Sequence, residues 1–200
     1  MSRPFILGLT GSIGMGKSAV AAILRELGVH VFDADAVVHQ LQAPGGILLP
    51  AIEAAFPGTT GPGGVDRQAL GAQVFGNPAA LARLEQIVHP AVGAERAAFL
   101  LEHGSEPLIV FDIPLLYEKG LGAGLDAVAV VSAPAEMQQA RVLARQSMTA
   151  DKFAQILALQ VPDAEKRARA DYVIDTGLTL DETHTQVAAL VESIRQKNQP

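Results

Sequence analysis

The chain has 200 residues, of which 49% are hydrophobic and 18% are charged, and this composition excludes an intrinsically disordered protein. Its length suits one folded core that carries insertions, so we exclude two large independent domains. Fifteen Lys and Arg against 21 Asp and Glu give a net charge of −6, so we expect neither a nucleic-acid partner nor a membrane partner. The absence of cysteine excludes thiolate metal sites and a cysteine nucleophile.

The apolar runs of this chain have the length of β-strands rather than of membrane spans, which need roughly 20 residues. We therefore expect a cytoplasmic protein, either a monomer or a small homo-oligomer. Buried strands are predicted over residues 5–9, 29–32, 108–111, 127–131 and 172–174. Helical patterns lie between these runs, among them residues 17–27, and a last helix is predicted over residues 180–197. The predicted class is therefore α/β with a parallel sheet.

Two longer stretches between the predicted strands favour helices. Residues 36–104 hold helical patterns separated by Gly and Pro, and we predict a helical insertion without a strand. The Gly and Pro cluster around residue 60 is either a mobile loop or a tight surface turn, which is the commoner case. Within it, Pro90 disfavours helical geometry at His89, so we expect a helix to end there. Residues 136–169 form a second, polar helical stretch.

A glycine-rich motif follows the first predicted strand and precedes the first predicted helix. It matches the pattern Gly, four residues, Gly, Lys, Ser, and its residues are Gly11, Ser12, Ile13, Gly14, Met15, Gly16, Lys17 and Ser18. In such a loop, main-chain N–H groups and the positive end of the helix dipole bind phosphate oxygens. We expect Lys17 to contact the β and γ phosphates of a nucleotide, Ser18 to ligate Mg²⁺, and Ala19 to contribute only its N–H. The alternative is a glycine-rich turn with a chance lysine.

Two carboxylates follow the second predicted strand. Asp33 and Asp35 would lie at the carboxyl edge of a parallel sheet, where the phosphate loop also lies. Transfer of a phosphoryl group to an alcohol requires a group that orients the hydroxyl and accepts its proton, so Asp33 is the candidate general base. The alternative is that both residues form a strand-end turn and a helix cap.

Further charged residues could complete a nucleotide site. Asp112 ends the third predicted strand and could hold a water molecule of the magnesium shell, or it could be a turn residue before a proline. Arg141 and Arg145 are four residues apart, so on a helix they share one face and could close over a triphosphate. The alternative for this pair is a solvated helix face. Three more cations are interpreted as surface charges: Lys166, Arg167 and Arg169.

Five segments of the chain together resemble the family of dephospho-coenzyme A kinases. They are residues 9–18, 33–35, 66–70 with 74–75 and 87–90, 114–118, and 139–145 with 170–175. Many families share the phosphate loop, whereas the Asp-Ala-Asp after the second strand, the His-Pro pair and the Pro-Leu-Leu box are together specific. The chain departs from the family pattern at Ala19, where Thr is frequent, at Tyr117, where Phe is usual, and at Thr176, where Asn commonly follows Asp.

This resemblance implies transfer of the γ-phosphate of ATP to the ribose 3′-hydroxyl of dephospho-CoA, with Mg²⁺ as the metal. It implies a P-loop NTPase fold with a five-stranded parallel sheet flanked by helices. It further implies three parts: a nucleotide-binding core of residues 1–35, 105–135 and 170–200, a helical substrate domain of residues 36–104, and a helical lid of residues 136–169.

The resemblance also implies roles for single residues. Asp33 resembles the family's base, the loop from Gly11 to Ser18 resembles its ATP loop, and Arg141 and Arg145 resemble its lid arginines. Matching positions with a supporting role in substrate binding are Thr10, Asp35, Arg67, His89 and Leu115.

Two other functions fit part of these observations. Another small-molecule kinase of the same fold, acting on a nucleoside or a sugar, would combine the same loop with a different insertion. A nucleotide-dependent switch of the GTPase type would need Asn-Lys-x-Asp and Asp-x-x-Gly motifs, and the sequence holds neither. We therefore expect a small-molecule kinase.

Overall fold

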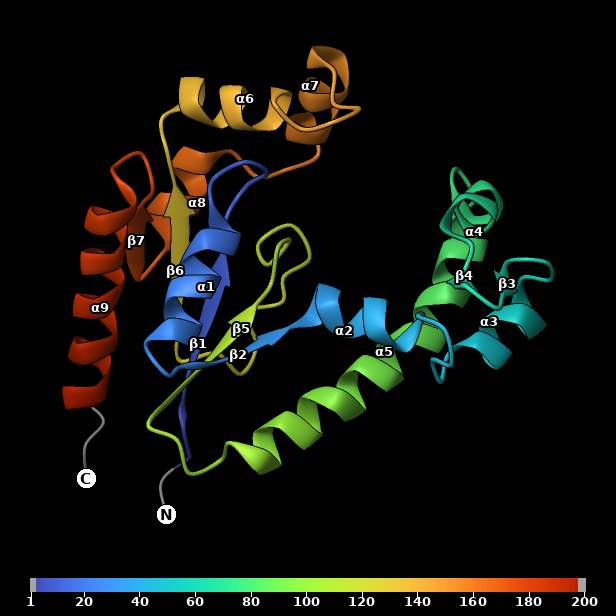
Figure 1. Ribbon diagram of the computed structural model, residues 1–200, viewed down its shortest axis with the longest axis horizontal. Coiled ribbons are helices and arrows are strands. Elements are labelled where there is room, and N and C mark those ends of the chain that lie inside the picture. The colour runs from blue at the N-terminus through green and yellow to red at the C-terminus, as the bar shows by residue number, and fades with distance from the viewer. Residues whose placement is uncertain (1–2, 198–200) are drawn as a thin grey trace. The chain divides into compact units, whose positions relative to one another are not determined.

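The computed structural model describes residues 3–197 and divides into two compact units (Figure 1). The core unit combines residues 3–32 with residues 103–197, and the insertion unit comprises residues 33–102. Among the described residues, no helix combines the length and the apolar character that crossing a bilayer requires.

The core unit is built on a five-stranded parallel sheet with the strand order β2-β5-β1-β6-β7. The central strand β1 (Phe5–Thr10) pairs in parallel with β5 (Leu108–Asp112) and with β6 (Ala127–Ser132). β7 (Tyr172–Asp175) pairs in parallel with β6, and β2 (His30–Asp33) lies at the other edge, beside β5. The predicted α/β class is confirmed, and each strand boundary lies within one residue of its prediction.

Two helices pack side by side against this sheet, α1 (Lys17–Glu26) and α9 (Leu180–Lys197) (Figure 1). Their apolar stripes and the sheet residues beneath them form one buried cluster, which includes Val20, Leu24, Val187, Val191, Ile194, Leu7, Leu9 and Val110. Burial of each such side chain stabilises the fold by about 1.5–3 kcal/mol. The cluster fixes the start of α1, and thereby the glycine-rich loop, against the carboxyl end of β1.

Three helices connect β6 to β7. They are α6 (Ala135–Leu143), α7 (Ala150–Ala158) and α8 (Asp163–Arg169), and α8 packs against β6. Thr149 caps α7, since its hydroxyl accepts a hydrogen bond from the Lys152 N–H at 3.2 Å.

The insertion unit is helical, as predicted, and has its own apolar cluster around Ile52 and Phe56. Its elements are α2 (Ala34–Leu41), α3 (Leu49–Ala55), β3 (Thr60–Gly61), β4 (Gly64–Val65), α4 (Arg67–Val74) and α5 (Pro78–Glu102). The predicted turn is present at residues 62–63, but the prediction that this insertion holds no strand was wrong, because β3 and β4 form a short antiparallel hairpin around it. Gly64 is required there: its φ is 92°, and a Cβ would lie 2.5 Å from the Gln42 carbonyl oxygen.

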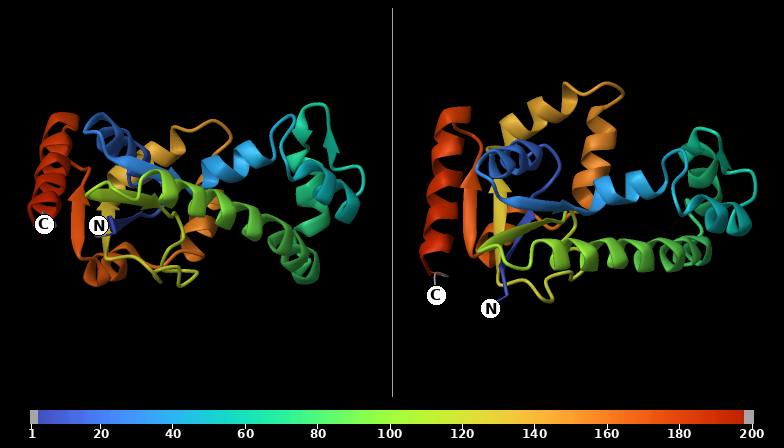
Figure 2. Two further views of the ribbon diagram at one scale, coloured as in Figure 1. Left: turned by 90° about the horizontal axis from the view of Figure 1, so that it is seen from below. Right: turned by 60° about the horizontal axis from the view of Figure 1, so that its bottom comes forward.

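The prediction that a helix ends at His89 was wrong, because α5 continues through Pro90 as one unbroken helix (Figure 2). A proline inside a helix removes one hydrogen bond and costs about 3 kcal/mol. Side chains on both sides of the proline offset this cost, because they pack against the insertion unit's cluster. These are Ile87 and Val88 before it and Ala91 and Val92 after it. Tertiary packing therefore overrides the local preference of the residue before proline.

The interpretation of Lys166 as a surface charge was also wrong, although Arg167 and Arg169 are exposed. The Lys166 side chain is fully buried, and its Nζ lies 2.7 Å from Oε1 of Glu118, a side chain that is 10% exposed. The same Glu118 oxygen accepts a hydrogen bond from the Val161 N–H at 2.9 Å. Burial raises the pKa of Glu118, but the interactions with Lys166 and Val161 outweigh burial and hold this pKa below its usual value.

Replacing Lys166 with methionine would leave the buried Glu118 carboxylate without its cation. We expect Lys166→Met to lower the free energy of unfolding by about 3–5 kcal/mol, the usual cost of removing one partner of a buried ion pair. Urea denaturation followed by circular dichroism measures this change. Lys152→Met is the matched control, because Lys152 lies exposed on α7, and we expect a change below about 0.5 kcal/mol. Equal stability of the two variants would contradict a stabilising role of the pair.

The lowered pKa of Glu118 also makes stability depend on pH. A carboxyl group whose pKa is lower in the folded state stabilises the fold above its unfolded pKa of about 4.3, and this contribution is lost as the pH falls through the folded value. We therefore expect the stability difference between the unaltered protein and Glu118→Gln to shrink as the pH falls from about 5 to about 3. Denaturation at several pH values measures it, and a constant difference would count against the ion pair.

Candidate functional site

The glycine-rich loop connects β1 to α1 at the carboxyl edge of the sheet. Gly14 and Gly16 have φ values of 79° and 88°, a left-handed conformation that glycine adopts without strain. Close packing adds a second reason for glycine: a Cβ on Gly14 would lie 2.4 Å from Val142 Cγ2, and one on Gly11 would lie 2.8 Å from the Val131 carbonyl oxygen. The loop is therefore held tightly between the sheet and α6.

Four N–H groups in the loop and at the start of α1 have no hydrogen-bond acceptor among residues 3–197. They belong to Gly14, Gly16, Lys17 and Ser18. The first N–H groups of a helix have no partner within it, and the positive end of the helix dipole lies at the same place. Gly14 is buried, and a buried N–H group in a folded protein ordinarily has an acceptor. An anion with several oxygens would satisfy these groups.

Lys17 and Asp112 form an ion pair beside the loop. Lys17 Nζ lies 2.5 Å from Asp112 Oδ1, and Asp112 is 3% exposed at the last position of β5. β5 pairs with β1 in the register Leu9 to Asp112, so the sheet sets this carboxylate next to the start of the loop. Asp112 is therefore not a turn residue, because it still belongs to β5 and the turn begins only after it. Its role at a nucleotide site stays a prediction.

Ser18 and Ala19, in the first turn of α1, are both exposed. The Ser18 hydroxyl and the Asp112 carboxylate are oxygen ligands of the kind that Mg²⁺ prefers, so the side chains at this end of the sheet fit that metal. In the described part of the chain, no three His, Asp or Glu side chains gather in a way that could hold a metal ion by themselves. A metal here would therefore depend on ligand oxygens as well.

Two glutamines, which the sequence analysis did not single out, bind the main chain of Ile13. Gln138 on α6 is 5% exposed, and its Nε2 donates to the Ile13 carbonyl at 2.7 Å. Gln160, which follows α7, accepts a hydrogen bond from the Ile13 N–H at 3.1 Å through Oε1. Both residues belong to the predicted lid stretch. No sequence signal distinguishes them, because Gln on a polar helix usually faces solvent.

The two arginines of the predicted lid have different surroundings. Arg141 is half-buried on α6 and donates to Thr176, from Nη1 to Oγ1 at 3.1 Å and from Nη2 to the carbonyl oxygen at 2.7 Å. Arg145 is exposed and lies beyond the end of α6 at Leu143. The prediction that both share one helix face was wrong, because the chain turns after Leu143 before α7 begins.

Asp33 is the last residue of β2, and its side chain caps α2. Its Oδ1 accepts a hydrogen bond from the Ala36 N–H at 2.9 Å, which is the cap that the alternative interpretation expected. This bond uses one carboxylate oxygen, so the cap and a role as base do not exclude each other. Asp35 is exposed in the first turn of α2.

The residues expected to support substrate binding divide between the two units. In the core unit, Thr10 is fully buried and its hydroxyl donates to the Pro114 carbonyl at 3.3 Å, while Leu115 is half-buried. In the insertion unit, Arg67 and His89 are exposed. Arg67 contacts the ring Nδ1 of His39 on α2.

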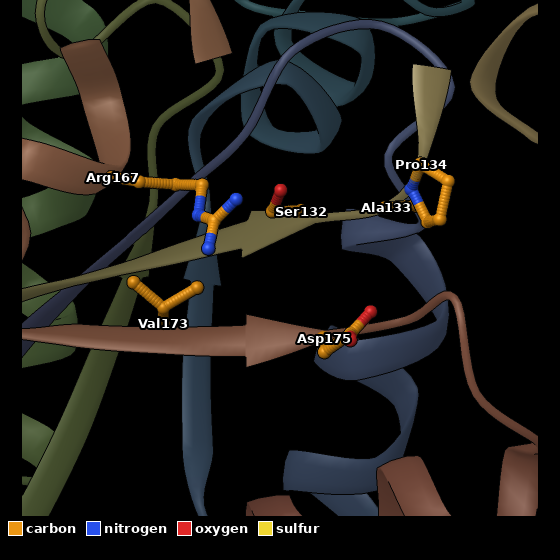
Figure 3. A pocket seen from close by; sticks show the side chains of 6 residues that line it. All are labelled: Ser132, Ala133, Pro134, Arg167, Val173 and Asp175. Carbon is orange, nitrogen blue, oxygen red and sulfur yellow. The ribbon is translucent and has the colours of Figure 1, made fainter. Parts of the chain in front are cut away.

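A small pocket lies where β6 and β7 end (Figure 3). Its lining residues are Ser132, Ala133, Pro134, Arg167, Val173 and Asp175. Figure 3 shows the Arg167 side chain of α8 pointing toward Ser132, with Asp175 at the end of β7. None of these residues is predicted to belong to a site from the sequence.

Comparison with known proteins agrees with this geometry. The sequence profile of the family described as "Dephospho-CoA kinase" matches residues 5–182. A dephospho-CoA kinase of Novosphingobium aromaticivorans is 75% identical over 198 residues, which are 99% of this chain and 98% of that protein. A crystal structure from Thermus thermophilus is 35% identical, covers 96% of this chain and 98% of its own, and superposes with a TM-score of 0.83.

A dephospho-CoA kinase structure from Campylobacter jejuni shares the fold. It is 23% identical, covers 96% of this chain and 98% of its own, and superposes with a TM-score of 0.66. The phosphate loop between a central parallel strand and a helix makes that fold a P-loop NTPase fold. The matched profile covers most of the chain, including the loop, the Lys17–Asp112 pair and the insertion. This chain therefore belongs to the dephospho-CoA kinase family.

Proposed function

We propose that this protein transfers the γ-phosphate of ATP to the ribose 3′-hydroxyl of dephospho-CoA, giving coenzyme A and ADP in the last step of coenzyme A synthesis. The observation that carries this function is that the N–H groups of Gly14, Gly16, Lys17 and Ser18 find no acceptor within residues 3–197 and lie beside the Lys17 cation. Membership in the family adds the acceptor alcohol. A kinase that acts on a nucleoside or a sugar is not favoured, because the family match extends through the insertion unit.

The phosphate loop would stabilise the negative charge of the phosphates electrostatically. Its N–H groups and Lys17 would bind the β and γ phosphates and neutralise charge that moves onto the leaving phosphate during transfer. Asp112 would keep the Lys17 ammonium in place before ATP binds, because the pair lies at 2.5 Å. Mg²⁺, held by the Ser18 hydroxyl and the phosphates, with Asp112 through a water molecule, would supply further positive charge.

Asp33 would act as the general base. It ends β2 and Asp112 ends β5, and these strands are neighbours in the sheet. As the ribose oxygen forms its bond to the γ-phosphorus, the bond to the bridging oxygen breaks and ADP leaves. The hydroxyl proton passes to the Asp33 carboxylate.

The rest of the chain would bind and enclose the substrates. The insertion unit would hold dephospho-CoA, with contributions from Asp35, Arg67 and His89, while Thr10 and Leu115 would contribute from the core unit. Residues 136–169 would form a lid that brings Arg141 and Arg145 to the triphosphate.

Acceptor preference is the direct test of the proposed substrate. In an assay that couples ADP release to NADH oxidation, we expect the value of kcat/KM to be highest for dephospho-CoA, by at least about a hundredfold over adenosine, shikimate or gluconate. The expectation follows because dephospho-CoA would offer the protein more groups to bind than these smaller alcohols do. Higher kcat/KM for any other alcohol would contradict the assignment.

Asp33→Asn separates the role of a base from that of a helix cap. An asparagine oxygen still accepts the bond from the Ala36 N–H, so the melting temperature should stay close to that of the unaltered protein. Because the amide cannot accept the proton, we expect kcat to fall by about 10² to 10⁴, with the Kd for ATP changed less than about threefold. Steady-state kinetics and calorimetry measure these values. A near-normal kcat would remove Asp33 as the base.

Lys17→Ala serves as the contrasting variant. It removes a cation from the phosphate site, so we expect both the affinity for ATP and kcat to fall. If Lys17→Ala and Asp33→Asn weakened ATP binding equally, the division between phosphate binding and proton transfer would be wrong.

Closure of a lid over residues 136–169 predicts slower amide hydrogen exchange in this segment when a non-hydrolysable ATP analogue binds. Exchange measured by mass spectrometry, with and without the analogue, provides the comparison, and α9 serves as the internal control. Unchanged exchange throughout the segment would contradict lid closure.

A further inference from the structure

Thr176, the residue after β7, binds the phosphate loop and α6 at the same time. Its hydroxyl donates a hydrogen bond to the Met15 carbonyl at 2.6 Å and accepts one from Arg141 Nη1 at 3.1 Å. Thr176 is 4% exposed, and its own N–H donates to the Ser132 carbonyl at 2.9 Å. Figure 3 shows the paired ends of β6 and β7, labelled at Ser132 and Asp175, and Thr176 follows Asp175 in the chain. The position of the hydroxyl is therefore fixed by the sheet.

The bond to Met15 sets the direction of the next N–H group. The peptide between Met15 and Gly16 is trans, as are all the described peptides, so its carbonyl and its N–H point in opposite directions. Holding the carbonyl against Thr176 thus turns the Gly16 N–H away from Thr176 and leaves it available to a ligand. Gly16 also packs closely here, since a Cβ on it would lie 2.9 Å from Thr176 Oγ1.

Thr176 restrains the Arg141 guanidinium as well. Arg141 donates both to the hydroxyl and, at 2.7 Å, to the carbonyl of this one residue. Two bonds to a planar group limit its rotation more than one bond does, and the remaining N–H donors of the group stay available to an anion.

We propose that Thr176 is a positioning residue for the nucleotide triphosphate. Its hydroxyl orients the Gly16 N–H through the Met15 carbonyl and holds the Arg141 guanidinium, so that both groups meet the phosphates. This role rests on the phosphate-binding function proposed above, but it is independent of which alcohol accepts the phosphoryl group.

Two matched variants test the role of the hydroxyl. Thr176→Val keeps the shape of the side chain and removes the hydroxyl, whereas Thr176→Ser keeps the hydroxyl. Calorimetric titration with Mg²⁺ and AMP-PNP measures affinity without any acceptor, so its result stands apart from the test of dephospho-CoA as the substrate. We expect Thr176→Val to raise the Kd about tenfold or more, and Thr176→Ser to stay within about threefold of the unaltered protein.

Titration with adenosine distinguishes a role in phosphate binding from a merely structural role, which would affect both ligands. Adenosine has no phosphates, so we expect both variants to bind it within about twofold of the unaltered protein. Unchanged AMP-PNP affinity in Thr176→Val, or an equal loss of affinity for adenosine, would overturn the proposal.

In the unaltered protein, the Thr176 hydroxyl proton should also give a slowly exchanging NMR signal. Its absence would overturn the proposal even if Thr176→Val failed to fold.

Discussion

The candidate site depends on backbone N–H groups that have no hydrogen-bond acceptor in the described part of the protein. A buried N–H group without an acceptor is costly, yet the buried Gly14 has no acceptor for its N–H among residues 3–197, and neither do Gly16, Lys17 and Ser18 at the positive end of α1. Left-handed φ values at Gly14 and Gly16 make this backbone path possible. The Lys17–Asp112 ion pair places a cation beside them. The surrounding fold holds the loop and this ion pair in place.

Residues far apart in the sequence hold the loop from several sides. Gln138 and Gln160 bind the two polar groups of Ile13, and Thr176 binds the carbonyl of Met15. The carboxyl ends of β6 and β7, together with the segment that joins them, supply all of these contacts. Any movement of that segment therefore changes the surroundings of the loop directly, which gives the proposed lid a physical connection to nucleotide binding.

Much of the fold follows from local patterns in the sequence. Continuous apolar runs marked the strands because a parallel sheet between layers of helices has no polar face. The phosphate loop could be predicted from the spacing of its glycines and lysine, and the position of Asp112 from the rule that parallel strands gather their carboxyl ends at one edge. Helix α5 could not be predicted in full, because contacts of the insertion unit on both sides of Pro90 outweigh the preference of the residue before it.

Single side-chain roles were harder to predict where the partner is distant. Lys166 lies in a charged run that usually faces solvent, and only its partner Glu118, 48 positions earlier, accounts for its burial (166 − 118 = 48). Arg141 and Arg145 have helical spacing, but α6 ends between them. Thr176 stood out only as a departure from the family pattern, and nothing local indicated its bonds to Met15 and Arg141.

The most direct test of the central claim follows the amide signals of the loop as ligand is added. In proton–nitrogen NMR spectra of the labelled protein, Mg²⁺ and AMP-PNP should shift the amide protons of Gly14, Gly16, Lys17 and Ser18 downfield, as expected for new hydrogen bonds to phosphate oxygens. Adenosine alone should leave them in place. If the triphosphate shifted other signals and left these four unchanged, the loop would not be the phosphate site.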